Sequence, residues 1–106
     1  MRGKTKEEIE IDFKRAIEQA QELEHLAENL SRVANGGVES ALLALKNNWR
    51  GDAGGSIELA GRRTIGEIYG TADDLMRIAR NIRSTADIVY KAEKRQRTYA
   101  FDQDSR

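Results

Sequence analysis

The stretch Asn47-Asn48-Trp49-Arg50-Gly51-Asp52 lies near the middle of the 106-residue chain and holds its single Trp. Long segments with periodically spaced apolar residues lead up to this stretch and away from it. Gly51 can adopt the positive φ that a tight bend requires, and Asp52 is a favourable helix N-cap. We therefore predict that residues 47–52 form the turn of an antiparallel helix-turn-helix hairpin.

The composition is typical of one helical domain spanning residues 1–106. Hydrophobic residues make up 39% of the chain and charged residues 34%, which is unlike a disordered protein. Pro is absent, so long helices are permitted, and the absence of Cys excludes disulfides, thiolate nucleophiles and zinc-ribbon sites. No apolar run approaches the ~20 residues that span a bilayer, and the charged start leads us to expect no cleavable signal peptide.

The first arm begins with Thr5-Lys6-Glu7-Glu8, which matches a helix capping box. Apolar or small residues then recur in alternating steps of three and four, the period of a coiled-coil seam. By seam we mean the residues of one helix that face the other helix. We predict helix one over about 5–46, with the following seam: Ile9, Phe13, Ala16, Ala20, Leu23, Ala27, Leu30, Ala34, Gly37, Ala41 and Ala44.

Asn35-Gly36-Gly37 interrupts the first arm with residues that disfavour a helix. Each Gly costs a helix interior roughly 1 kcal/mol relative to Ala, and the triplet is compatible with the end of one helix and the start of another. The apolar steps nevertheless keep their phase across it, through residues 30, 34, 37 and 41. We therefore favour a continuous or kinked helix over a break.

The second arm carries a seam of the same kind. It predicts helix two over about 53–97, followed by a frayed tail over 98–106. Its seam residues are Gly61, Ile65, Ile68, Ala72, Leu75, Ala79, Ile82, Ala86 and Val89.

Folding the chain about residue 51 predicts which residues face each other, because the numbers of antiparallel partners then add to about 102. The pairs place large residues opposite small ones, as interdigitating side chains require. They are Gly37 with Ile65, Ala34 with Ile68, Leu30 with Ala72, Ala27 with Leu75, Leu23 with Ala79, and Ala20 with Ile82. Gly36 falls opposite Gly66, which predicts a close approach of the helices there.

Charge is balanced overall, with 18 basic and 18 acidic residues, but it is unevenly distributed. Residues 7–28 are mainly acidic, and residues 77–97 are mainly basic. The hairpin places these two stretches side by side. We therefore interpret the basic stretch as a face that pairs with its own hairpin rather than as a nucleic-acid surface.

Apolar residues that flank the two seams predict a second partner. A stripe wider than one seam cannot be covered by a single neighbouring helix, and two hairpins that form a four-helix bundle on dimerisation would cover it. The sequence leaves a homodimer and a heterodimer equally open. The partner-facing candidates are Ile17, Leu26, Val33, Leu45, Tyr69, Met76, Ile78 and Tyr90.

Residues that carry catalytic or metal chemistry are sparse. His25 is the single His, and Glu22 precedes it with the Glu-x-x-His spacing that di-iron bundles use. A di-iron site needs more than one such motif. Because Leu23 is the seam residue, Glu22 and His25 are expected on the outer face of the helix. The glycines match neither a phosphate loop nor a dinucleotide motif. We expect no enzymatic activity, no metal and no cofactor.

The central Trp49-Arg50-Gly51 between two long amphipathic arms resembles the WXG family of type VII secretion substrates, the early-secreted-antigen-like helical hairpins. The resemblance implies a hairpin that homodimerises or pairs with a related hairpin. It also implies residence in the cytoplasm of a Gram-positive-type bacterium, followed by export through a type VII secretion ATPase to the cell surface or medium. Trp49 and Gly51 would then form part of the export signal.

The chain departs from that family after helix two, where a Tyr-x-x-x-Asp/Glu motif is frequent. Here Tyr90 is followed four residues later by Lys94, and Tyr99 by Gln103. The departure favours a chain whose signal is completed by a partner, such as the helical N-terminal domain of a secreted toxin. The alternative is a cytoplasmic coiled-coil adaptor or chaperone with no export role.

Overall fold

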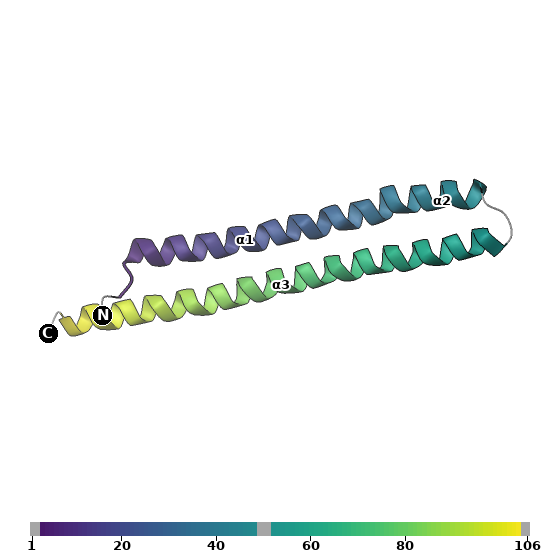
Figure 1. Cartoon of the computed structure of the whole chain (residues 1–106). Coiled ribbons are helices and arrows are strands. Elements are labelled where there is room, and N and C mark those ends of the chain that lie inside the picture. Colours follow the sequence, from purple (N-terminus) through teal and green to yellow (C-terminus); the bar gives the residue numbers. More distant parts are fainter. Residues whose placement is uncertain (1–2, 49–51, 105–106) are drawn as a thin grey trace. The chain divides into compact units, whose positions relative to one another are not determined.

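The structure is a computed structural model that describes residues 3–48 and 52–104, with side chains described for residues 3–48 and 55–98 (Figure 1). Helix α1 spans Lys6–Arg32 and continues through a π-helical segment, Val33–Val38, into α2, Glu39–Asn48. Helix α3 spans Asp52–Asp104. Every element in the described ranges is a helix, which confirms the all-α class.

The predicted capping box at the start of α1 is confirmed. The Glu8 amide donates to Thr5 Oγ1 at 3.1 Å, and the Thr5 amide donates to Glu8 Oε1 at 3.3 Å. The Ile9 amide donates to the Thr5 carbonyl at 3.0 Å. These bonds satisfy amide groups that lack partners within the first turn, so the helix begins where the sequence predicts it.

The helices extend further than the sequence predicts. Asn47 and Asn48 belong to α2 and Asp52 belongs to α3. The other residues of the predicted turn, 49–51, lie outside the described residues. Helix α3 continues to Asp104, past its predicted end at about residue 97. No Gly or Pro follows Gly70, and Thr98 Oγ1 donates to the Lys94 carbonyl at 3.0 Å, so the segment predicted as a tail contains no helix breaker.

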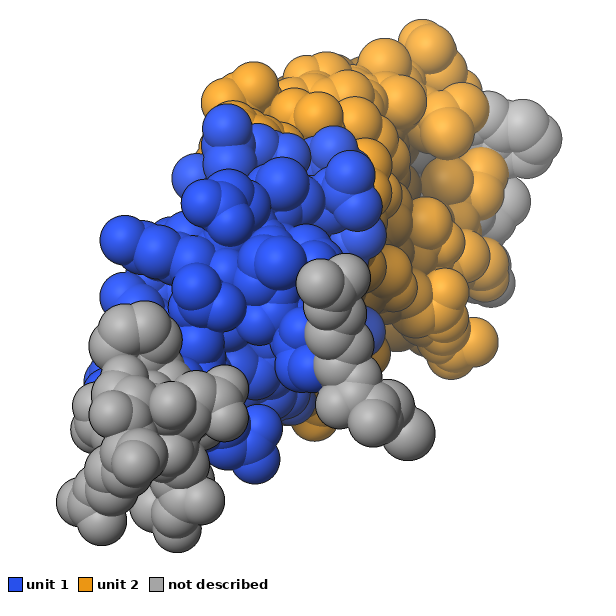
Figure 2. Space-filling view, turned by 90° about the vertical axis from the view of Figure 1, so that its left-hand side faces the viewer, with its two compact units in different colours: residues 1–22, 78–106 blue, residues 23–77 orange. Residues whose placement is uncertain are grey.

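The chain divides into two compact units, which are coloured separately in Figure 2. Unit 1 combines Met1–Glu22 with Ile78–Arg106, and unit 2 is Leu23–Arg77. Each unit therefore contains part of the first arm and part of α3. Below, each unit is described by itself.

Unit 2 has a small apolar core formed by Ala34, Leu42 and Ile65. Four partly buried residues pack against it: Val38, Ile57, Ile68 and Tyr69. Cross-helix contacts show an antiparallel register, because Leu42 meets Gly61, Glu39 pairs with Arg62, and Asn35 pairs with Tyr69. The numbers of each pair add to about 102, in agreement with the register that the sequence predicts.

The close approach of helices occurs at Gly61, and the prediction that placed it at Gly36 and Gly66 is wrong. A Cβ atom at Gly36 or Gly66 would meet no heavy atom within 4 Å. A Cβ atom at Gly61 would lie 2.9 Å from Cδ2 and 3.1 Å from Cγ of Leu42. The Leu42 side chain therefore occupies the space that the missing Gly61 side chain leaves.

The π-helical segment Val33–Val38 explains why Leu42 faces α3. A π turn contains about one residue more than an α turn, so it shifts every following residue around the helix. After the buried Ala34, the residues that face α3 are the half-buried Val38 and the buried Leu42. Helix continuity through this triplet is confirmed, but the predicted phase is wrong: Gly37, Ala41 and Ala44 are exposed.

Unit 1 pairs the start of α1 with the C-terminal half of α3. Ile9, Ala20 and Ala79 are buried, as predicted for seam residues. Val89 lines the space between α1 and α3 as predicted, but it is 44% exposed. The neighbouring Tyr90 packs its ring on Phe13, with ring centroids 4.5 Å apart.

Candidate interaction surfaces

The most deeply buried seam residues of the first arm and α3 are small, and most of the larger ones are half-exposed. Ala20, Ala27, Ala34, Ile65, Ala72 and Ala79 are buried, whereas Leu23, Leu30, Ile68, Leu75 and Ile82 are half-buried. Among the residues whose side chains are described, the fully buried ones are alanines. A larger side chain reaches past the single facing helix, so part of its surface stays in water.

The eight partner-facing candidates fall into three groups. Leu26, Val33, Leu45 and Ile78 are exposed, and Ile17 and Met76 are half-buried. Tyr69 and Tyr90 are also half-buried, but each contacts other side chains of its own unit. Further large apolar residues are exposed outside the predicted set: Ile11, Leu43, Leu59 and Ile88.

The two tyrosines, predicted to face a partner, also make contacts within the chain. The Tyr69 hydroxyl donates to Asn35 Oδ1 beside the core of unit 2. The Tyr90 hydroxyl donates to Glu10 Oε1 at 2.6 Å while its ring packs on Phe13. A helical apolar pattern cannot reveal such contacts, because the polar partner of each hydroxyl lies on the other helix.

Lys94 completes the cluster around Tyr90. Its ammonium donates to the Tyr90 hydroxyl at 3.1 Å, lies 4.8 Å from the ring centroid, and lies 3.7 Å from Glu10 Oε1. The hydrogen bond with Tyr90 raises the pKa of Lys94, with a further contribution from Glu10. The cluster is a polar contact between an acidic stretch of α1 and a basic stretch of α3, as the charge pattern predicts.

Other basic residues of α3 pair within their own helix. Arg77 lies 3.1 Å from Asp74, and Lys91 lies 3.0 Å from Asp87. These contacts leave less unpaired positive charge on the basic stretch than its composition suggests, and they weaken its interpretation as a nucleic-acid surface.

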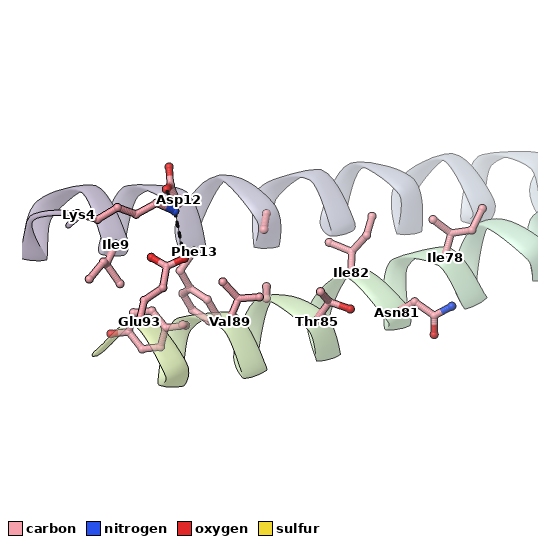
Figure 3. A pocket seen from close by; sticks show the side chains of 13 residues that line it. Lys4, Ile9, Asp12, Phe13, Ile78, Asn81, Ile82, Thr85, Val89 and Glu93 are labelled. Atoms are coloured by element: carbon pink, nitrogen blue, oxygen red, sulfur yellow. Dashed lines mark hydrogen bonds and ion pairs between the residues drawn. The ribbon is translucent and has the colours of Figure 1, made fainter. Parts of the chain in front are cut away.

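An apolar groove runs between α1 and α3 in unit 1 (Figure 3). It has a volume of about 450 Å³. Its α3 wall follows a helical stripe in steps of three and four, and α1 contributes the opposite wall. The lining residues include Ile9, Phe13 and Ala16 from α1, and Ile78, Ile82, Thr85, Ala86 and Val89 from α3. Such a groove between two helices is suited to receive the apolar face of another helix.

Lys4 links the chain start to both walls at one end of this groove (Figure 3). Its ammonium lies 2.9 Å from Asp12 Oδ2 and 3.0 Å from Glu93 Oε1. The hydrogen bond with Asp12, and then that with Glu93, raises the pKa of Lys4. Because Lys4 precedes α1, this contact holds the residues before the helix against α3.

The described residues contain no group of three or more His, Cys, Asp or Glu side chains that would hold a metal ion. Glu22 and His25 are both exposed on α1, as the sequence predicts. His25 Nδ1 lies 4.0 Å from Glu28 on the same helix. No helix in the described ranges is long and apolar enough to cross a bilayer.

Trp49 and Gly51, the residues of the predicted export-signal turn, lie outside the described residues. The candidate site that the structure does describe is therefore the set of apolar surfaces on the two units. No family model, curated protein or solved structure matches the chain.

Proposed function

We propose that this chain is a helical pairing module that a second hairpin completes, and that it is a type VII secretion substrate or targeting partner. We infer pairing from the incomplete core, in which the fully buried side chains are alanines and most of the larger apolar residues remain partly exposed to water. Covering one Leu, Ile or Val side chain contributes about 1.5–3 kcal/mol. Several such residues together favour association strongly.

The proposed complex is a four-helix bundle. The partner is a second copy, a related hairpin, or the helical N-terminal domain of a larger secreted toxin. The groove of unit 1 supports this geometry, because its apolar lining matches the face of a third helix. In this proposal Trp49-Arg50-Gly51 forms part of the export signal that a type VII secretion ATPase reads, so the protein starts in the cytoplasm and ends at the cell surface or outside.

A cytoplasmic coiled-coil adaptor or chaperone is the second candidate function. The same exposed apolar residues would serve such an adaptor, so the pairing surface does not separate the two roles. The turn distinguishes the two roles. In an adaptor Trp49 and Gly51 would only close the hairpin, whereas in an exported protein they would also form part of the export signal.

The purified chain is expected to self-associate, or to form a complex with its related hairpin, in sedimentation equilibrium. Leu26→Gln is expected to weaken association because Leu26 is exposed and apolar. Glu22→Gln, one helical turn earlier on the exposed surface, is the matched control and is expected to leave association unchanged. A chain that stays monomeric with every related hairpin tested and melts cooperatively would contradict the pairing.

Trp49→Ala is expected to abolish export from a bacterium that carries the secretion machine, while association persists. The measurement is the amount of protein in the medium and in the cell, with the dimer followed in parallel. Arg50→Ala alters the variable position of the same turn and is expected to retain export. Wild-type protein that stays inside such cells would instead support the adaptor.

A further inference from the structure

The first arm carries two apolar stripes after Ala34, and in the structure one of them contacts α3. Val38, the last residue of the π-helical segment, and Leu42, which follows that segment, both face α3. Gly37, Ala41 and Ala44 continue the upstream seam in regular α-helical phase, yet they are exposed. The two stripes are offset by one residue, which is the offset that the π turn introduces.

We propose that residues 39–48 have two registers on α3. In the observed register, the π-helical segment directs Leu42 into the space above Gly61. In the second register, residues 33–38 form a regular α-helix, and α2 is turned by about 100° about its axis. Gly37, Ala41 and Ala44 then face α3.

Opposing effects keep the two registers close in free energy. The observed register buries the large Leu42 side chain but requires π-helical hydrogen bonds, which are rarely sustained in proteins. The second register restores α-helical hydrogen bonds but buries only small residues. A Cβ atom at Gly36 or Gly37 would meet no heavy atom within 4 Å. Contacts with α3 therefore do not hold the backbone of these two residues in one conformation.

The polar contacts that hold the observed register are exposed and therefore weak. Glu39 Oε1 accepts from Arg62 Nη1 at 2.6 Å, and Lys46 Nζ lies 3.2 Å from Glu58 Oε1. The Tyr69 hydroxyl donates to Asn35 within the π-helical segment itself. A turn of α2 breaks these contacts without leaving a buried charge.

The second register changes the surface that unit 2 presents. Val38, Leu42 and Leu45 are spaced as i, i+4 and i+7, so they form one apolar stripe beside the seam once α2 has turned. A helix that binds this stripe favours the second register by its differential affinity. This consequence rests on the proposed pairing, whereas the two registers are a property of the chain alone.

The test measures distances between nitroxide labels by pulsed electron spin resonance. The chain has no Cys, so labels attach only at introduced positions, and Ser40→Cys with Thr64→Cys places them at exposed sites on α2 and α3 of unit 2. A turn of α2 moves the Ser40 label around the helix and changes this distance. The doubly labelled parent chain is expected to show a major distance and a second, less populated one.

Three further variants in the labelled background assign the distances. Deletion of Gly36 removes the extra residue and is expected to leave only the major distance, since Val38 and Leu42 then face α3 from a regular helix. Ala41→Asp blocks the second register and is expected to remove the minor distance. Leu42→Ala removes the side chain that favours the observed register and is expected to raise the minor population about tenfold or more.

A single shared distance in the parent chain, in Leu42→Ala and in the Gly36 deletion would overturn the proposal. Should Leu42→Ala lose its helical circular dichroism, Gly61→Ala replaces it, because the added methyl group occupies space that Leu42 fills in the observed register. No partner is present, so failure here leaves the proposed pairing and export intact.

Discussion

Ala34→Asp is expected to unfold unit 2. Ala34 is fully buried in the cluster with Leu42 and Ile65, so a carboxylate there loses water and gains no cationic partner. Leaving one charge buried without a partner costs about 3–5 kcal/mol, which is comparable to the total stability of a small domain. Urea unfolding followed by circular dichroism at fixed protein concentration measures the loss, and fixing the concentration keeps any association constant.

Ala41→Asp is the matched control for this variant. Both alanines lie on the stripe that the sequence predicts as the seam, but Ala41 is exposed in the structure. Its replacement is expected to change stability by about 0.5 kcal/mol or less, as for other surface positions. An equal loss of stability in both variants would show that the regular α-helical phase dominates and that the π-helical register is wrong.

Leu42→Ala is expected to destabilise the chain by about 1–2 kcal/mol. This is less than the usual cost of removing a buried Leu, about 2–5 kcal/mol, because the second register, in which Leu42 is exposed, limits the loss. Leu43→Ala is the control, because Leu43 is the next residue and is 60% exposed. Its loss is expected to cost well under half as much. Thermal and urea unfolding of the two variants side by side check the difference, and similar values for both would contradict the burial of Leu42.

Gly61→Ala extends this test to the other side of the contact. Ala favours a helix over Gly by about 1 kcal/mol, but a methyl group at Gly61 meets Leu42. We expect Gly61→Ala to be less stable than Gly66→Ala, whose methyl group meets open space. In the double variant with Leu42→Ala, the penalty at Gly61 is expected to vanish. Additive effects would show that the two residues are not in contact.

Local features of the sequence predicted much of this fold. The capping box at Thr5 predicted the start of α1, because its hydrogen bonds involve residues three positions apart. The alternating steps of three and four residues predicted the seam positions that the structure buries, among them Ala20, Ala27 and Ala79. The antiparallel register near Gly61 followed from folding the chain about its centre.

The candidate interaction surface was predicted less well. Leu26, Val33, Leu45 and Ile78 were expected at the surface and are exposed there. Tyr69 and Tyr90 are half-buried and also contact their own chain, because Asn35 and Glu10 on the other helix accept their hydroxyl hydrogens. A pattern read along one helix has no information on such acceptors.

The sequence by itself determined the helical class and the helix start at Thr5, because both depend on residues only a few positions apart. It also determined the antiparallel pairing, because that pairing follows from folding the chain about one central turn. Only the tertiary structure decided the phase after Ala34. Asn35-Gly36-Gly37 is compatible with either an α or a π turn, since its glycines pack against nothing. The decision came from α3, where the space above Gly61 accommodates Leu42. The gain from burying that Leu outweighs the cost of one irregular turn.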